Sequence, residues 1–288
     1  MSSFSILGLT HKCHKLPKEK KGNCTSSPSD VKHLAERKPD SHKGQNGIVL
    51  CIVGSKQYHG AAVFAAKTAS LFVDLIYVLS EKENLPILKK ASLEFIVSEL
   101  TLKNARKFAE KADSILIGPG LDANNEDKKI INYLLKNFRH KKFILDASAL
   151  CLADKKLLSK NCVLTPHAAE FKKMFKAEAT AENAKKFAKK YNCIIVLKSN
   201  INIISDGKSI YHNLTGNAGL TTGGTGDVLA GMLAAFACKN DLKQASLAAI
   251  FLNGFAGDIL KEQRGYAFNA ENLMQILPFA KKFCEDNY

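Results

Sequence analysis

The residues best suited to chemistry lie in a glycine-rich segment, residues 213–227, that leads into an apolar run at 228–237. Its five glycines let the backbone approach a ligand closely. The apolar run predicts a helix whose first amides lack intrahelical partners and point toward the same ligand. Asp227 lies where those amides begin. A carboxylate beside such an anion site is suited to deprotonating a hydroxyl group while a phosphoryl group is delivered to it.

A simpler interpretation makes Asp227 the N-cap of that helix, because aspartate is among the residues preferred there. A cap requires one polar residue, whereas this segment is glycine-rich over its whole length. We therefore favour the phosphate site. The two roles are compatible, since one carboxylate can serve both in different states.

Composition indicates a globular protein and excludes several classes. The chain has 288 residues, of which 46% are hydrophobic and 24% charged, and its net charge is +15. The lysines are scattered without interleaved aromatic residues, so we expect no nucleic-acid partner. No apolar stretch is long enough to span a membrane, and the N-terminus lacks a signal-peptide pattern, so we expect no membrane association and a cytoplasmic location. Most cysteines lie within apolar runs, which is typical of reduced core residues.

The chain divides into a basic tail or linker at residues 1–40, expected to be flexible, and one domain at residues 41–288. Within the domain, short β-branched runs alternate with helical stretches, which predicts an α/β fold with a mainly parallel sheet covered by helices on both faces. Strands are expected at 48–53, 114–117, 142–145, 162–165 and 193–197, with helices at 61–72, 127–137 and across 168–190. A hairpin is expected at 201–212, around Asp206 and Gly207, and helices across 241–284.

In open α/β sheets, ligands bind beyond the carboxyl ends of the strands, so the residues that follow each strand are informative. Gly118, Asp146, His167 and Lys198 all lie at or just after such ends. Gly54 to Gly60 is not a P-loop, because no Lys-Ser or Lys-Thr pair follows its second glycine. The Gly-x-Gly-x-x-Ala pattern from Gly118 resembles a dinucleotide fingerprint, but its continuation is typical of a turn.

Taken in order, these segments resemble the ADP- or ATP-dependent NAD(P)H-hydrate dehydratases of the ribokinase-like superfamily. The resemblance covers residues 41 to about 278. It rests on segments 41–44, 60–62, 118–121, 145–147, 165–170, 196–198, 215–217 and 223–227. It implies a ribokinase-like fold and a metabolite-repair lyase that dehydrates the S epimer of NADH hydrate and NADPH hydrate. The nucleotide would be ADP, giving AMP and phosphate, or ATP, and the route would be phosphorylation of the ring hydroxyl. Mg2+ would be the metal cofactor.

The resemblance also assigns roles by position. Asp227 would be the general base, and Ala62, Gly120, His167 and Asp227 would contact the hydrated dinucleotide. The nucleotide would bind Lys198, Ser199, Asn200, Ile201 and Asn202, together with Gly223, Gly224, Thr225 and Gly226. Glu170 would hold magnesium through water.

Several of these side chains also have plain structural interpretations, which remain open at this point. His167 is either a donor to the substrate or a loop histidine satisfied by backbone, and Glu170 either a metal ligand or a first-turn helix glutamate. Lys198 is either a phosphate ligand or an exposed lysine. Asp146 is expected only to cap the helix after it.

The sequence departs from the family pattern in the loop after Lys198, which lacks the usual glycine and threonine. The choice between ADP and ATP is therefore open. Two other functions remain as alternatives: a vitamin-precursor kinase of the same superfamily, and a non-catalytic nucleotide-binding protein. A homo-oligomer and a functional pairing with an NAD(P)H-hydrate epimerase are also expected, the latter because many relatives carry an epimerase domain.

Overall fold

The computed structural model of the chain describes residues 24–288, and within them ten strands form one sheet in the order β1-β10-β9-β8-β7-β6-β5-β2-β3-β4. Strands β2 to β8 are parallel, β9 is antiparallel to both of its neighbours, and β1 is parallel to β10. The strands are β1 (Cys24–Thr25), β2 (Ile48–Ile52), β3 (Leu75–Ser80), β4 (Phe95–Glu99), β5 (Ser114–Ile117), β6 (Lys142–Leu145), β7 (Cys162–Leu164), β8 (Ile194–Leu197), β9 (Asn202–Ser205) and β10 (Ile210–Asn213). The mainly parallel α/β sheet predicted from the sequence is confirmed.

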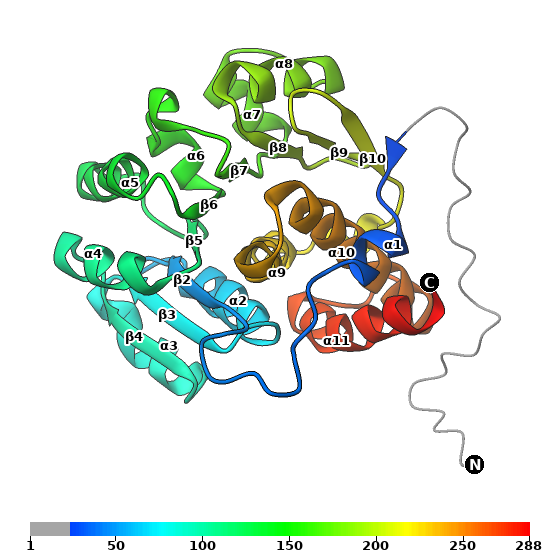
Figure 1. Ribbon diagram of the computed structural model, residues 1–288, viewed down its shortest axis with the longest axis horizontal. Coiled ribbons are helices and arrows are strands. Elements are labelled where there is room, and N and C mark those ends of the chain that lie inside the picture. The colour runs from blue at the N-terminus through cyan, green and yellow to red at the C-terminus, as the bar shows by residue number, and fades with distance from the viewer. Residues whose placement is uncertain (1–23) are drawn as a thin grey trace.

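Helices cover both faces of this sheet (Figure 1). They are α1 (Pro28–Lys32), α2 (His59–Ser70), α3 (Leu85–Ala91), α4 (Leu102–Lys111), α5 (Asn125–Asn137), α6 (Ser148–Leu152), α7 (Ala168–Phe175), α8 (Ala181–Tyr191), α9 (Thr225–Lys239), α10 (Leu242–Arg264) and α11 (Ala270–Asn287). The same described residues contain three short 3-10 helices, η1 (Lys82–Asn84), η2 (Lys155–Leu157) and η3 (Ala218–Thr221). No helix in the described part of the chain is long and apolar enough to cross a membrane.

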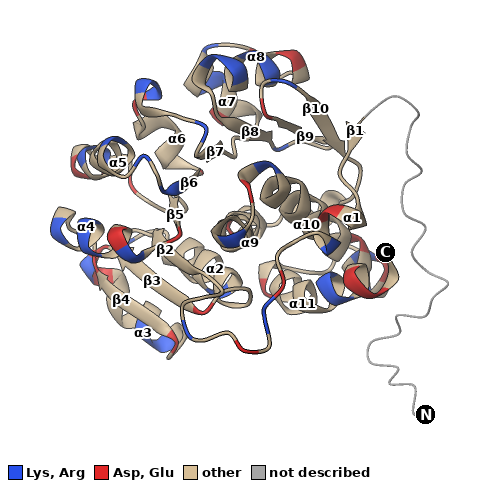
Figure 2. Ribbon diagram, viewed as in Figure 1, with Lys and Arg blue, Asp and Glu red and all other residues tan. Residues whose placement is uncertain are grey.

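The two faces of the sheet form two separate cores, because alternate residues of each strand point to opposite sides. Val49 and Cys51 of β2 belong to the core made with α2, α9, α10 and α11. Leu50 and Ile52 belong to the core made with α4 to α8. Lys and Arg are spread over the outer helices α4, α5 and α8 and over α11, and are not gathered on one element (Figure 2).

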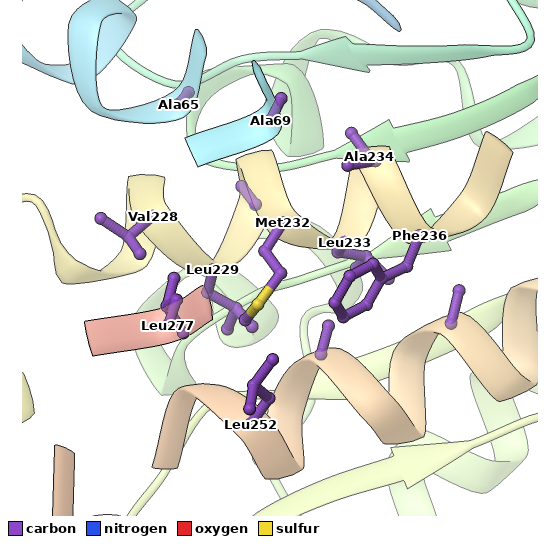
Figure 3. Close-up of a cluster of buried hydrophobic side chains, with 14 of the residues drawn as sticks. Ala65, Ala69, Val228, Leu229, Met232, Leu233, Ala234, Phe236, Leu252 and Leu277 are labelled. Atoms are coloured by element: carbon purple, nitrogen blue, oxygen red, sulfur yellow. The ribbon is translucent and has the colours of Figure 1, made fainter. Parts of the chain in front are cut away.

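Helix α9 is the centre of the first core and carries the glycine-rich segment at its amino-terminal end. Its side chains are buried on nearly every side against α2, α10 and α11, as Figure 3 shows for Val228, Met232 and Phe236. At Gly231 a Cβ would lie 2.2 Å from the carbonyl oxygen of Ala65, so glycine allows α2 and α9 to touch through their backbones. This packing fixes the direction in which the first turn of α9 points.

The N-terminal boundary expected from the sequence differs from the structure. Residues 24–34 are part of the fold, because β1 extends the sheet beside β10 and Val31 and Leu34 are buried in the first core. The periodicity there is too short to stand out, since α1 has only five residues. The expected tail at residues 1–23 lies outside the described residues.

Two further strands, β3 and β4, and the helices α3 and α4 lie in residues 75–111, for which no element was expected. The expected hairpin is confirmed as β9 and β10, and the helices across 168–190 as α7 and α8.

Candidate active site

Three strands that lie side by side, β6, β7 and β8, end in polar residues that meet. Asp146, Thr165 and Lys198 directly follow these strands. Lys198 Nζ donates to Asp146 Oδ1 at 2.7 Å, and Thr165 Oγ1 donates to the same oxygen at 2.8 Å. The side chain of Asp146 is only 4% exposed and that of Lys198 22% exposed. The ammonium group is therefore held in a fixed, partly buried position.

The amino-terminal end of α9 faces this ammonium group. A Cβ placed on Gly226 would lie 3.9 Å from Lys198 Nζ, so the lysine lies directly over the second residue of the helix. The first amides of a helix have no intrahelical partners, and the helix dipole favours negative charge at that end. Gly223 borders open space, since a Cβ there would meet no atom of the described residues within 4 Å. The lysine and the helix end together make a candidate anion site.

Asp227 is the third residue of α9 and stands beside that anion site. Burial above all, and then the nearby Asp146 carboxylate, raise its pKa to about 7, although Lys198 acts to lower it. Among the described residues, none donates a hydrogen bond to its carboxylate. A carboxylate with a pKa near neutrality is a far better proton acceptor than an ordinary aspartate.

The N-cap interpretation of Asp227 is wrong, because the helix begins two residues earlier. Thr225 is its first residue and Gly224, with φ of 93°, is its N-cap. The Asp227 side chain is thus not needed to close the helix end. The Thr225 hydroxyl instead donates to the carbonyl oxygens of Leu220 and Thr222, which makes it a structural group of this turn.

Lys198 remains protonated although it is largely enclosed. Burial acts to lower its pKa, but the carboxylates of Asp146, Glu170 and Asp227 outweigh it and raise the pKa above its usual value. One cation thus lies among three acidic groups. An incoming phosphate would compete for the same ammonium protons.

His167 lies next to Lys198, because the two backbones form a parallel β-bridge. Its Nδ1 accepts the backbone N–H groups of Ala169 and Glu170 at 3.1 and 3.4 Å, so the ring is the N-cap of α7. A neutral ring in this state carries its proton on Nε2. The backbone interpretation of His167 is therefore correct for Nδ1, and Nε2 is left as a donor on an exposed side chain. The structure thus brings Asp227, Lys198 and His167 to one site.

Glu170 completes the capping box of α7. Its Oε2 accepts the backbone N–H of His167 at 2.8 Å, and its Oε1 lies 3.6 Å from His167 Nε2. Its contacts are therefore those of a glutamate in the first turn of a helix. Among the described residues, no group of three or more His, Cys, Asp or Glu side chains could hold a metal ion.

The two residues assigned to the dinucleotide from α2 and the β5–α5 loop differ in exposure. Ala62 is fully buried, and its methyl group lies 2.7 Å from where a Cβ of Gly54 would be. Gly120 is partly exposed, with φ of 67°, and a Cβ there would lie 2.6 Å from the carbonyl oxygen of Tyr58. Gly120 and the exposed side chain of Tyr58 therefore lie at the surface beside the carboxyl ends of β2 and β5.

The loop after Lys198 is closed by its own side chains despite lacking the expected glycine. Asn202 Oδ1 accepts the backbone N–H of Ser199 at 3.0 Å, and Ser199 Oγ donates to the carbonyl oxygen of Ile201. Ser199, Asn200 and Ile201 are exposed. The loop is thus a compact turn that presents an apolar side chain to solvent beside the anion site.

Comparison with known proteins identifies the family. The family model described as NAD(P)H-hydrate dehydratase matches residues 49–279. The chain belongs to the NAD(P)H-hydrate dehydratase family. An ADP-dependent (S)-NAD(P)H-hydrate dehydratase from Cenarchaeum symbiosum is 36% identical over 272 residues, covering 87% of this chain and 94% of the relative.

Relatives of this chain in the dehydratase family differ in length. A bifunctional NAD(P)H-hydrate repair enzyme from Methanocaldococcus jannaschii is 37% identical over 261 residues, covering 86% of this chain and 51% of that enzyme. The chain thus spans about half the length of the bifunctional relatives. The crystal structure of the ADP/ATP-dependent NAD(P)H-hydrate dehydratase from Bacillus subtilis, co-crystallized with ATP and Mg2+, matches with a TM-score of 0.81 and 28% identity, covering 92% of this chain and 100% of that chain. The fold is ribokinase-like.

In this member of the dehydratase family, sequence reasoning missed Asp146. It was expected to cap α6, but the N-cap is Ala147, and no side chain among residues 24–288 caps that helix. Asp146 instead holds Lys198 and Thr165 from neighbouring strands. The available signal was a polar residue at the end of each of three adjacent strands. Only the strand order shows that these residues meet.

Proposed function

We propose that this chain dehydrates the S epimer of NADH hydrate and NADPH hydrate at the expense of ADP or ATP. One observation carries the proposal: Lys198 Nζ lies over Gly226, and Asp227 is the next residue of the same helix turn. An anion site and a proton acceptor with a pKa of about 7 therefore lie side by side. Phosphoryl transfer to a hydroxyl group needs both.

The nucleotide's terminal phosphate would bind to Lys198 and to the first amides of α9. Its adenosine portion would extend over the loop from Lys198 to Asn202, where the exposed Ile201 side chain offers an apolar contact. Gly223 keeps a side chain out of the phosphate path, and Gly224, where a Cβ would lie 2.7 Å from the Phe64 ring, lets the turn pack against α2. Magnesium would enter bound to the phosphates, because the described side chains form no metal cage of their own. Glu170 reaching that ion through water remains part of the proposal.

The hydrated nicotinamide ring would bind on the other side of Asp227, toward Gly120 and His167. His167 Nε2 can donate a hydrogen bond to the amide or phosphate groups of the dinucleotide. Ala62 would support this side from within the fold, since it is fully buried and packs against Gly54 of the β2–α2 loop. The ring hydroxyl would then lie between the Asp227 carboxylate and the terminal phosphorus.

In the first step Asp227 takes the hydroxyl proton as the hydroxyl oxygen bonds to phosphorus. The bond from phosphorus to the bridging oxygen breaks, and AMP leaves when ADP is the donor. In the second step the ring nitrogen's electron pair expels the phosphate from the ring carbon. Loss of a proton from the neighbouring ring carbon restores the double bond, and phosphate is released. The esterified oxygen leaves far more readily than hydroxide would.

The test is a parallel assay of the purified chain with hydrated NADH, Mg2+ and either ADP or ATP. We expect recovery of the near-ultraviolet absorbance of the reduced nicotinamide ring, with one phosphate released per ring restored. Phosphorylation of a vitamin-precursor alcohol without this recovery would instead support the kinase alternative. Nucleotide binding with neither activity would support a non-catalytic protein.

Two partnerships belong to the same proposal. An enzyme specific for the S epimer needs the R epimer to be converted, so an NAD(P)H-hydrate epimerase is the expected functional partner. The bifunctional relatives, of whose length this chain spans about half, support such a pairing. A homo-oligomer and a cytoplasmic location remain predictions.

A further inference from the structure

The loop that precedes the anion site is held by a carboxylate from a different helix. Asp258 of α10 accepts two hydrogen bonds from residues 216 and 217: its Oδ2 from the backbone N–H of Gly216 and its Oδ1 from Asn217 Nδ2, each at 2.9 Å. Asn217 Oδ1 in turn accepts the backbone N–H of Gly219 at 3.0 Å, which starts η3. One side chain therefore fixes both the backbone and the capping residue of this loop.

The surface of α10 around Asp258 is shaped to receive the loop. A Cβ on Gly254 would lie 2.3 Å from Thr215 Oγ1, and a Cβ on Gly257 would lie 2.9 Å from Leu220. Either side chain would push the loop off the helix. Two glycines and one carboxylate on successive turns thus form a docking face for residues 215–220.

The loop passes this restraint on to the first turn of α9. Leu220 packs against Gly257, and its carbonyl oxygen accepts the hydroxyl of Thr225 at 2.6 Å. Thr225 also bonds to Thr222 through both its hydroxyl and its backbone N–H. Because Gly226 and Asp227 follow Thr225 in the same turn, their positions depend on where Leu220 and Thr222 lie.

We propose that Asp258 is a positioning residue that acts through residues 216–222 to set the position of the Gly226 amide and the Asp227 carboxylate. It touches neither nucleotide nor dinucleotide in this role. A loop freed from Asp258 lets the α9 turn shift relative to Lys198. Displacement of a reacting group by about 1 Å lowers rates by up to about a hundredfold. The inference deepens the proposed function and rests on it for its kinetic part.

The experiment compares Asp258→Ala with Asp241→Ala on the same helix. Asp241 is the N-cap of α10 and accepts the backbone N–H groups of Lys243 and Gln244, so its loss weakens α10 without touching the loop. We expect Asp258→Ala to lower kcat by about 10- to 100-fold, while Asp241→Ala stays near the wild-type value. Hydrogen exchange of the peptide covering residues 214–227 should become faster in Asp258→Ala only.

A double-variant cycle with Asn217→Ala separates positioning from general destabilisation. If Asp258 acts through Asn217 and its neighbours, the double variant should be hardly slower than Asp258→Ala alone, because both changes break one chain of contacts. Asn217→Ala also serves as the test if Asp258→Ala does not fold, since it leaves α10 intact. It should then show the lower kcat and the faster loop exchange by itself.

Unchanged kcat and unchanged loop exchange in folded Asp258→Ala, with a melting temperature lowered as in Asp241→Ala, would overturn the proposal. So would fully additive effects in the cycle. If the wild-type chain proves inactive on hydrated NADH, the proposed function fails instead. Loop exchange and ADP affinity, measured by calorimetry, would still report whether Asp258 holds the anion site.

Discussion

The first turns of α5 and α9 carry the same residue in the same place but in different surroundings. Asp127 and Asp227 are each the third residue of their helix, and the pKa of each is raised, to about 6 and about 7. Burial is the main cause in both. For Asp127 the other charges that raise it are carboxylates, those of Glu81, Asp122 and Glu126, whereas Asp227 also faces the ammonium group of Lys198.

The hydrogen bonds of the two aspartates differ even more. Asn124 caps α5, accepting the backbone N–H of Asp127 and donating to its carboxylate. The corresponding residue of α9 is Gly224, which has no side chain to offer. The carboxylate of Asp127 is thus hydrogen-bonded within its own helix, whereas none of the described residues donates to that of Asp227. A raised pKa therefore does not by itself identify a catalytic group; the missing local partner and the nearby cation distinguish the two.

The largest expected effect comes from removing the charge of Asp227. Asp227→Asn should lower the dehydration rate by about 10²- to 10⁴-fold, because the amide cannot take the hydroxyl proton. Asp127→Asn, the matched control, should change it little. Steady-state rates with saturating ADP measure both. Equal losses of dehydration rate in the two variants would show that Asp127 and Asp227 do not differ in their roles.

The same two variants should be more stable than the wild type at alkaline pH. A carboxyl whose folded pKa lies above its unfolded value of 3.8 is costly to ionise in the fold. The cost is absent below that value and grows as pH rises, up to about 6 for Asp127 and about 7 for Asp227. At pH above these values each asparagine variant should gain on the order of 1–3 kcal/mol.

Urea unfolding of both variants and the wild type at acidic and alkaline pH measures this gain. The gain should disappear at acidic pH, where the carboxyl is protonated in both states. A gain in stability that does not depend on pH, or a loss of stability at alkaline pH, would show that the pKa values of these two groups are not raised in the fold.

The smallest effect concerns two helix N-caps replaced by glycine. Ala147, the N-cap of α6 and neighbour of Asp146, has φ of 47°, which is strained for alanine, whereas Asn124 has φ of −96°. Ala147→Gly should therefore stabilise the fold by about 1 kcal/mol, and Asn124→Gly should destabilise it by a few tenths of a kcal/mol or more, because a cap is lost. Thermal unfolding distinguishes the signs. A destabilised Ala147→Gly would mean that the site region stores no strain at this residue.

The strand-end loops were predictable because each follows a recognisable apolar run. Lys198, His167 and the glycines before Asp227 were found in this way, and the structure brings them together. Residues 24–34 were missed because a two-residue strand and a five-residue helix have no clear periodicity. Asp146 was misinterpreted as a cap because its partners, Thr165 and Lys198, are 19 and 52 residues away.

The sequence by itself determined the kind of fold and the chemical groups at the strand ends, since apolar periodicity and glycine-rich turns are local properties. Only the tertiary structure decided the pKa of each of these groups and which of them are hydrogen-bonded to other residues. Burial and the order of strands and helices determine the pKa of Asp227. They also determine the hydrogen bonds of Asp146 to Lys198 and of Asp258 to residues 216 and 217. Those properties depend on the distances between residues that are remote in the chain and on how deeply each side chain is buried.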